Sequence, residues 1–579
     1  MRTWQKVLLL SIPTFLIFLF LVLFSIVIFR FRNIERISLS KEHYVTLSLS
    51  GEIFEKPPRD VFSQMILEDR PTILNLLHNI QMAQNDRSVK GLILMPSNLQ
   101  LGWAKLEELR NALIHFKSSG KELVSFLEHA TTSDYFLATA SEKIYMLPTG
   151  QLFLVGLMSE MMFLKGTFDK IGIQADFEHI GQFKTSAEIY TRDKMSTPHR
   201  RMINELLDDI FEQLLTAIEE TRGIPKDRLV RLLDQGPFDT KTALKVGLID
   251  SAVYWDQLEN LLGIEMESIS KIGYSRYARE HDITRQFSFA PKIALIFAQG
   301  TIVFGSSGYH PYYGDVLGSE TISRYIRKAA DDNSIEAIVM RIDSPGGSGA
   351  AADAIWHEIV LAQEKKPFVV SMSDVAASGG YYIAMAADTI VAQPGTITGS
   401  IGVLSGKFNM KALYNKIGIT KETVTRGKHV DIYSDYRGFT REERKLIREQ
   451  LQDFYNNFVT KAAEGRHKTF ENIDKVARGR VWTGRQAVKI GLVDTLGGLD
   501  TALNIAKKMA GLLEDEKIQI VVYPKEKSWI ESFIKRNIQS MSFGHQLFPQ
   551  ELFNNWEQVS TLFHDKQILA LMPYQIKIR

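Results

Sequence analysis

The sequence predicts an α/β protein built from two copies of one domain and preceded by a single transmembrane helix. Three observations predict this fold class. Short apolar runs alternate with amphipathic stretches, which favours parallel strands covered on both faces by helices. Motifs of the first half recur in the second half at a nearly constant offset. The chain also begins with a long apolar run that carries no charge.

The N-terminal element is the uncharged run at residues 7–29. At about 1.5 Å per residue, a helix of this length reaches about 34 Å and can cross a bilayer core of about 30 Å. The run is longer than the core of a typical signal peptide, and no small-x-small cleavage motif follows it. We therefore expect an uncleaved anchor rather than a cleaved signal or a buried core helix.

The charges beside this run say little about its orientation. Basic residues flank it on both sides, with Arg2 and Lys6 before it and Arg30, Arg32 and Arg36 after it. The rule that positive charge stays cytoplasmic slightly favours a cytoplasmic body. No second run of this kind occurs in the sequence, so the remainder is expected to form a soluble body tethered by one helix.

Composition excludes several classes of function. The chain has 579 residues, of which 45% are hydrophobic and 23% charged, an ordinary balance for a globular protein. A net charge of +2 and the lack of a long basic stripe give no reason to expect a nucleic-acid partner. Because cysteine is absent, disulfides, thiolate metal sites and a cysteine nucleophile are excluded.

The internal repeat has an almost fixed register. DKIGI at 169–173 matches NKIGI at 415–419, an offset of 415 − 169 = 246. The same offset relates Pro148 to Pro394, Gly156 to Gly402 and Gly181 to Gly427, and KVGLID at 245–250 matches KIGLVD at 489–494 at an offset of 244. A register held over about 100 residues predicts that each half folds as one copy of the same domain.

The elements of the second copy follow from its hydrophobic pattern. We expect strands at 292–300, 337–343, 367–372 and 389–393, and helices at 350–366, 380–388 and 440–465. The last helix is capped by Thr440 and has a counterpart at 197–223 in the first copy. The predicted domains are an anchor at 1–36, a first, degenerate repeat at 37–285, a second repeat at 286–511 and an extension at 512–579.

The two copies differ at one group of residues. Subtracting 246 places Ser378 opposite Thr132, and it places the turn SPGG at 344–347 opposite 98–101, where no glycine pair remains. Conversely, Lys184 of the first copy lies opposite Val430 of the second. The joint presence of a serine–glycine turn and a double-glycine turn in one copy suggests that they serve one purpose.

Acyl transfer would unite these features. A serine hydroxyl needs a base to become a nucleophile, and none of the histidines is obviously placed to supply one. A lysine can act instead if burial lowers its pKa enough to make the amine neutral. Glycine turns and the start of a helix leave backbone N–H groups free to bind a developing oxyanion. We therefore predict Ser378 as nucleophile and Lys184 as base, one from each copy.

Four motifs together resemble those of the signal peptide peptidase A (protease IV) family in its long, duplicated form. They are RIDSPGGSG at 341–349, SDVAASGGYYIAMAAD at 373–388, TGSIGV at 398–403 and, in the upstream copy, GQFKTSAE at 181–188. The resemblance runs from the anchor to about residue 510, and the ending ALMPYQIKI is also similar to that family.

The resemblance implies a fold and a set of site residues. The fold would be two tandem domains of the crotonase and Clp protease type, each a spiral of ββα units. Ser378 would be the nucleophile and Lys184 the general base of a Ser–Lys dyad. Gly379, Gly346 and Gly347 would lie near the oxyanion donors. Ser400 would orient the lysine, although a simple turn serine is an equally good interpretation of that position.

The resemblance also implies a biological role. The expected protein is a membrane-anchored serine endopeptidase that hydrolyses hydrophobic peptides such as cleaved signal peptides. It would assemble as a homotetramer on the cytoplasmic membrane, with its body outside the cytoplasm, a topology that the charges flanking the anchor do not favour. No metal or cofactor is expected, since the sequence contains no Walker motif, no HExxH motif and no coherent zinc-ligand spacing.

Two alternative functions remain at this point. A crotonase-like enzyme that handles acyl-CoA thioesters would use oxyanion turns without a serine nucleophile. A catalytically silent membrane scaffold would keep the fold without turnover. The joint retention of the serine, the lysine and the glycines favours the peptidase over both.

Overall fold

The computed structural model describes residues 42–56, 71–264, 270–280, 290–310, 314–524 and 568–572. The predicted anchor at 7–29 lies outside these residues. Within the described ranges, no helix is both long and apolar enough to cross a membrane.

Each copy is built on a mostly parallel sheet, and the two sheets have the same strand order. The first sheet runs β6–β4–β3–β2–β1–β8 and the second β19–β17–β15–β13–β9–β21. The strands of the first sheet are β1 (His43–Gly51), β2 (Val89–Leu99), β3 (Glu122–Thr131), β4 (Lys143–Phe153), β6 (Phe238–Asp239), β7 (Ser251–Ala252) and β8 (Ser270–Gly273). Those of the second are β9 (Lys292–Gln299), β13 (Ile335–Ser344), β15 (Phe368–Ala377), β16 (Thr389–Ala392), β17 (Ile397–Gly399), β19 (Val481–Thr483), β20 (Thr495–Leu496) and β21 (Gln519–Tyr523). The shared order is what a duplicated domain requires.

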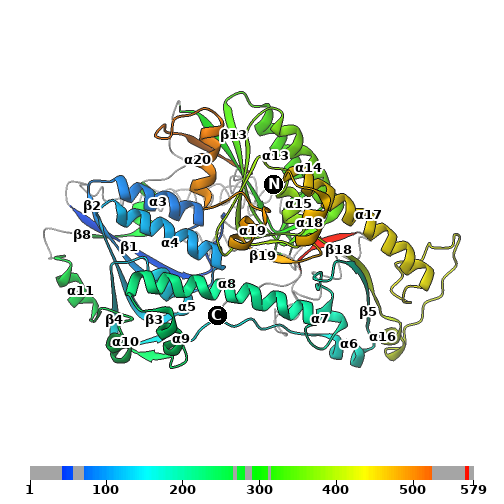
Figure 1. Cartoon of the computed structure of the whole chain (residues 1–579), viewed down its shortest axis with the longest axis horizontal. Coiled ribbons are helices and arrows are strands. Elements are labelled where there is room, and N and C mark those ends of the chain that lie inside the picture. The colour runs from blue at the N-terminus through cyan, green and yellow to red at the C-terminus, as the bar shows by residue number, and fades with distance from the viewer. Residues whose placement is uncertain are drawn as a thin grey trace, which may run out of the picture.

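A third sheet joins the two copies. Its order is β11–β12–β10–β14–β22–β18–β5. Its strands are β5 (Gln174–Ile180), β10 (Thr301–Val303), β11 (Gly308–His310), β12 (Gly314–Gly318), β14 (Gly346–Ser348), β18 (Val403–Asn409) and β22 (Leu569–Leu571). β5 belongs to the first copy by sequence but pairs antiparallel with β18 of the second along its whole length. The first copy therefore reaches into the second at the right of Figure 1.

Helices lie beside all three sheets (Figure 1). In the first copy they are α3 (Ile73–Asn85), α4 (Trp103–Ser118), α5 (Thr132–Ala138), α6 (Lys165–Ile171), α7 (Glu188–Thr191), α8 (Thr197–Arg222), α9 (Lys226–Leu233), α10 (Thr240–Val246), α11 (Trp255–Leu261) and α12 (Tyr274–Glu280). In the second they are α13 (Ser319–Asp331), α14 (Gly349–Gln363), α15 (Gly379–Ala384), α16 (Lys411–Lys416), α17 (Arg441–Gly465), α18 (Phe470–Val476), α19 (Gly484–Ile490) and α20 (Leu499–Met509).

The predicted elements of the second copy form where the hydrophobic pattern placed them. The strand β9, which has a parallel neighbour on each side, is buried from Ile293 to Ala298, as expected of a strand covered on both faces. α17 begins at a capping box, in which the Thr440 hydroxyl accepts from Glu443 N and the Glu443 carboxylate accepts from Thr440 N. The helix predicted at 380–388 is shorter than expected, since α15 ends at Ala384.

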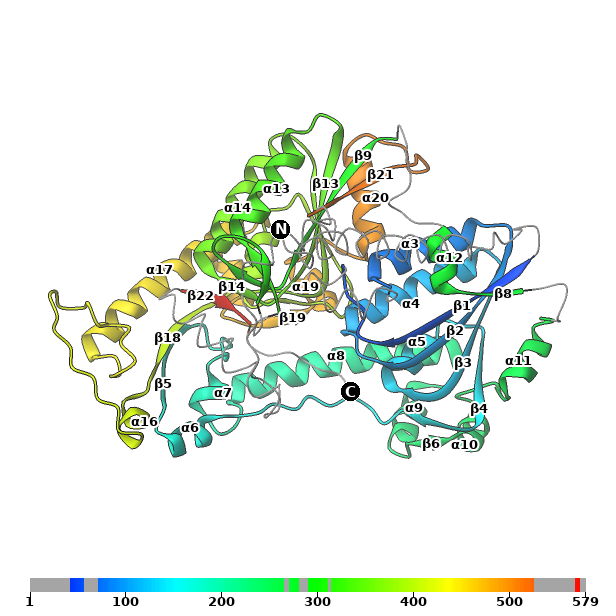
Figure 2. The ribbon, with the colours of Figure 1, turned by 180° about the vertical axis from the view of Figure 1, so that it is seen from behind.

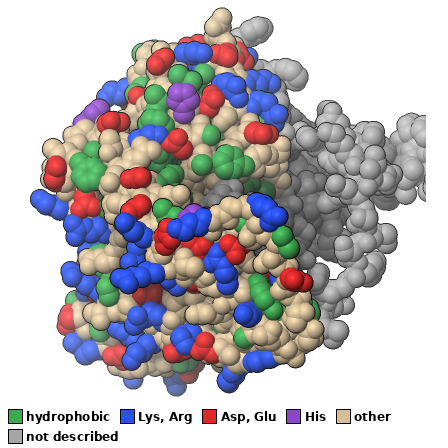
Figure 3. All heavy atoms as spheres, turned by 90° about the vertical axis from the view of Figure 1, so that its right-hand side faces the viewer, with side chains coloured by type: hydrophobic (Ala, Val, Ile, Leu, Met, Phe, Trp, Pro, Cys, Tyr) green, Lys and Arg blue, Asp and Glu red, His purple; other side chains and the backbone are tan. Residues whose placement is uncertain are grey.

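Ion pairs hold β5 against α17, at the end of the molecule shown in Figure 3. Arg444 of α17 pairs with Asp176 at 2.6 Å and with Glu178 at 2.8 Å. On this face lysine and arginine side chains lie among aspartates and glutamates (Figure 3). These pairs fix the segment that follows β5, which carries Lys184, to the second copy.

Candidate active site

Ser378 lies at the turn where β15 ends and α15 begins. Its backbone has φ 57° and ψ −113°, a conformation that non-glycine residues rarely adopt. Two hydrogen bonds hold it there, from Ser378 N to Gly399 O at 2.8 Å and from Tyr382 N to Ser378 O at 2.8 Å. A Cβ on Gly380 would lie 2.5 Å from Ser344 O, so glycine is needed at that position of the turn.

The two tyrosines after the glycines anchor the short helix α15. The Tyr381 hydroxyl donates to Leu492 O at 2.9 Å, and the Tyr382 hydroxyl donates to Asp353 at 2.6 Å. Both side chains are completely buried. The aromatic pair of the DVAASGGYY motif therefore fixes the helix that holds the serine in its strained turn.

Lys184 reaches Ser378 from the other copy. Its Nζ lies 2.7 Å from Ser378 Oγ, 3.1 Å from Ser400 Oγ and 3.2 Å from Ser400 O. Backbone contacts set this position, since Phe183 N donates to Arg478 O at 2.9 Å and a Cβ on Gly479 would lie 2.4 Å from Lys184 N. The structure thus brings together three of the predicted site residues.

Burial lowers the pKa of Lys184 to about 7. The side chain is 1% exposed, and its polar neighbours are serine hydroxyls and a backbone carbonyl rather than carboxylates. Removing an ammonium group from water disfavours its charged form, and no paired anion offsets the loss here. At neutral pH a large fraction of Lys184 is therefore an uncharged amine that can accept a proton.

We expect activity to depend on the protonation of Lys184. Only the neutral amine can take the Ser378 proton, and the neutral fraction grows as pH rises through a pKa of about 7. The kcat/KM for a hydrophobic peptide should therefore rise about tenfold per pH unit below about pH 6 and level off above about pH 8. Initial rates measured between about pH 5 and pH 9 test this, and a profile that is flat or falls with pH contradicts it.

The predicted oxyanion glycines meet beside the nucleophile. A Cβ on Gly379 would lie 3.1 Å from Gly346 Cα and 3.2 Å from Gly347 N, so the two turns are in close contact. Gly346 has φ 100° and its N–H donates to Ser344 Oγ at 3.2 Å. This leaves the N–H groups of Gly347 and Gly379 as the candidates for binding an oxyanion, while Gly346 permits the turn.

In the first copy, an aspartate stands at the position that corresponds to Gly380. Asp134, which lies opposite Gly380, accepts hydrogen bonds from Asn98 N at 2.9 Å and Leu99 N at 3.0 Å. These residues lie opposite the start of the SPGG turn. Thr132, opposite Ser378, has its hydroxyl 3.4 Å from Phe153 O. A side chain of the first copy thus binds the backbone of the segment that lies opposite the start of the SPGG turn, a feature that the sequence comparison did not predict.

A buried ion cluster lies where the two copies meet. Arg341, 1% exposed, binds Glu55 at 3.1 Å and also pairs with Glu108, both from the first copy. The same guanidinium donates to Ser371 Oγ at 2.9 Å. The only signal in the sequence was an arginine directly after the apolar residues AIVM at 337–340, and its partners could not be inferred from it.

Lys105 extends this cluster to the two strand ends beside the dyad. Its Nζ lies 2.8 Å from Asp343, which precedes the SPGG turn on β13, and 3.1 Å from Asp374, which precedes Ser378 on β15. Burial opposes the charge on Lys105, but the carboxylates of Asp343, Asp374 and Glu55 raise its pKa well above the usual value. The first copy therefore holds both catalytic turns through one cation.

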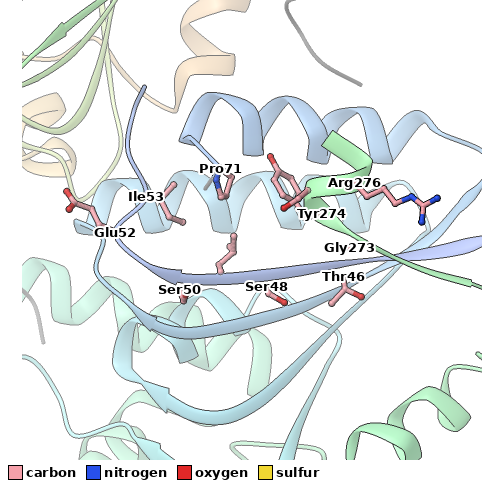
Figure 4. A pocket seen from close by; sticks show the side chains of 11 residues that line it. Thr46, Ser48, Ser50, Glu52, Ile53, Pro71, Gly273, Tyr274 and Arg276 are labelled. Atoms are coloured by element: carbon pink, nitrogen blue, oxygen red, sulfur yellow. The ribbon is translucent and has the colours of Figure 1, made fainter. Parts of the chain in front are cut away.

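A separate cavity of about 460 Å³ lies beside β1 and α12 (Figure 4). Hydroxyl groups of Thr46, Ser48 and Ser50 line one side, with Tyr274 and Arg276 opposite. None of the residues of the dyad borders it. Because Ser378 and Lys184 contact each other outside this cavity, we place the chemistry at Ser378.

Comparison with known proteins identifies the family. The family model described as peptidase family S49 matches residues 115–267 and 361–513, two segments whose first residues are offset by 361 − 115 = 246. The chain belongs to peptidase family S49. The offset between the two S49 matches equals the one found within the sequence.

S49 relatives cover most of the chain. It is 34% identical over 488 residues to "Serine protease SPPA, chloroplastic" of Arabidopsis thaliana, covering 83% of this chain and 71% of the relative. It is 28% identical to "Protease 4" of Haemophilus influenzae, covering 86% of this chain and 84% of the relative, and 30% identical to "Protease 4" of Salmonella typhi, covering 86% and 83%. The chain is thus a serine peptidase.

Among solved structures, a mutant ClpP1 from Listeria monocytogenes aligns with a TM-score of 0.24 and 16% identity, over 36% of this chain and 94% of that chain. A score of that size adds nothing to the description of the fold.

Proposed function

We propose that this S49 peptidase hydrolyses hydrophobic peptides with Ser378 as nucleophile and Lys184 as general base. The observation that carries the proposal is the 2.7 Å contact between Lys184 Nζ and Ser378 Oγ in a site shielded from water. The crotonase-like alternative uses no serine nucleophile, and a silent scaffold has no need of a neutral lysine beside a strained serine. Membership of a peptidase family supports the same conclusion.

The geometry supports a two-step mechanism. Lys184 takes the hydroxyl proton as Ser378 Oγ attacks the peptide carbonyl carbon, and the carbonyl oxygen becomes an oxyanion beside the N–H groups of Gly347 and Gly379. The C–N bond then breaks, and the lysine passes its proton to the leaving amine. Water repeats the sequence on the acyl-enzyme and releases the acid. Ser400 holds the amine through its hydroxyl and its carbonyl.

Labelling of the whole protein in detergent tests the assignment. We expect a fluorophosphonate to form one adduct that peptide mapping places on Ser378, and the labelled enzyme to lose hydrolysis of casein and of hydrophobic peptides. Ser405→Ala is a matched control, because Ser405 is equally buried but lies 3.4 Å from the Tyr433 hydroxyl, away from the lysine. It should label normally. An adduct elsewhere, or binding of coenzyme A without peptide hydrolysis, contradicts the proposal.

We further propose that the run at 7–29 anchors the enzyme in the cytoplasmic membrane, with a tetrameric body on the outer side that receives cleaved signal peptides. The length of the run and the family resemblance support this. Comparing protease digestion of spheroplasts with that of inverted vesicles tests on which side of the membrane the body lies. Light scattering of the solubilised enzyme measures the number of subunits. Protection of the body in spheroplasts, or a monomeric mass, contradicts the corresponding part.

A further inference from the structure

The strand β22 near the C-terminus lies between β14 and β18 of the third sheet (Figure 2). It runs antiparallel to β14, with Ala570 opposite Gly347, and it contacts β18 through Leu569 opposite Leu404. Beyond the strand, Met572 N donates to Pro345 O at 2.7 Å. A segment more than two hundred residues away in sequence thus adds an extended strand to the turn that carries the oxyanion donors. This is how an extended peptide binds to a strand edge.

The register of β22 places one carbonyl beside the turn that holds the nucleophile. A Cβ on Gly346 would lie 2.0 Å from Ala570 O and 2.6 Å from Gly379 N, and a Cβ on Gly379 would lie 3.0 Å from Ala570 O. The Ala570 carbonyl oxygen therefore lies between the two glycine turns, beside Gly379, the residue that follows Ser378. In the proposed mechanism this is where the carbonyl of a cleaved peptide must lie.

Two side chains of β22, those of Leu569 and Ala570, are buried. Leu569 is 1% exposed and belongs to an apolar cluster with Leu164 and Phe168 of the first copy and Leu404 of the second. Ala570 is completely buried. Successive residues along an extended strand point to opposite faces, so Leu569 and Ala570 occupy different sites.

The nucleophile is inaccessible while β22 is in place. Ser378 is 0% exposed and Lys184 1%. We propose that Leu569–Leu571 is an internal competitor that occupies the peptide-binding groove, and that a substrate binds by replacing it. The proposal rests on the proposed function, and it adds a substrate class: peptides with a small residue at the cleaved carbonyl and an aliphatic residue immediately before it.

Two variants of the full chain test this occupancy. One lacks residues 568–579, and the other carries Leu569→Asp, which puts a charge into the apolar cluster. In both we expect fluorophosphonate to label Ser378 at least about tenfold faster and KM for a hydrophobic peptide to fall at least about tenfold, because a competing occupant lowers apparent affinity by the fraction of empty groove. Leu513→Asp is the control, since Leu513 is 69% exposed, and it should change neither value.

A synthetic peptide with the sequence of residues 567–574 supplies the reverse experiment. Added to the truncated chain, it should inhibit competitively and restore slow labelling, whereas a scrambled peptide should not. Unchanged labelling in both variants overturns the proposal, as does loss of labelling in a truncated chain whose circular dichroism is native, since β22 would then be part of the catalytic structure. If wild type and variants all fail to label at Ser378 even at high reagent concentration, the proposed function fails instead.

Discussion

Replacing Lys184 by methionine is expected to lower kcat/KM for a hydrophobic peptide by at least about 10³-fold, because a dyad that acts as a unit loses nearly all its catalysis with either member. Methionine has nearly the same length and suits a buried site, so the fold should survive. The remaining rate should no longer rise with pH through about 7, since the group with that pKa is gone.

Lys407→Met is the matched control for that experiment. Lys407 is 4% exposed and its pKa is lowered to about 8, mainly by burial. Its Nζ, however, donates to Ile432 O at 2.6 Å rather than to a serine. We expect this variant to keep its activity. If Lys184→Met retains more than about a tenth of wild-type activity, Lys184 is not the base.

Replacing Arg341 by methionine is expected to lower the free energy of unfolding by about 3–5 kcal/mol, because two buried carboxylates lose their shared cation. Glu55 and Glu108 are 2% and 3% exposed and cannot regain the water they gave up on folding. Urea unfolding followed by circular dichroism measures the change. Both carboxylates belong to the first copy, so separation of the two copies should begin at a lower urea concentration.

Arg327→Met provides the comparison. Arg327 also pairs with a glutamate, Glu358 at 3.4 Å, but its side chain is 62% exposed. Exposed pairs contribute about 0–1 kcal/mol, so the control should be nearly neutral. If Arg341→Met changes stability as little as Arg327→Met does, the buried cluster does not hold the copies together.

Much of this molecule could be predicted from local patterns. The apolar strand at 292–300 and the helix capped by Thr440 carry their signals within a few neighbouring residues, and the structure confirms both. Ser378 and Lys184 were predicted to be partners because the two copies differ there in complementary ways. The structure places them in contact, and their catalytic roles stay proposals.

The features that could not be predicted depend on partners distant in sequence. An arginine in a buried strand indicates that some carboxylate is near, but nothing local identifies Glu55 or Glu108. By sequence pattern Asp134 is an ordinary helix-capping residue. Its hydrogen bonds to Asn98 N and Leu99 N of the same copy follow only from the fold. Three residues of β22 are too few for a periodicity to predict their strand, let alone its neighbours.

The contact between Lys184 and Ser378 joins groups 194 residues apart, and this separation affects when activity can arise during synthesis of the protein. Ribosomes deliver the amine long before the hydroxyl, so a nascent chain holds a base with nothing to activate. A fragment that begins after the lysine has the opposite deficiency. Peptidase activity can arise only after most of the chain has been translated and the two copies have folded against each other. Incomplete chains therefore cannot hydrolyse peptides in the cell.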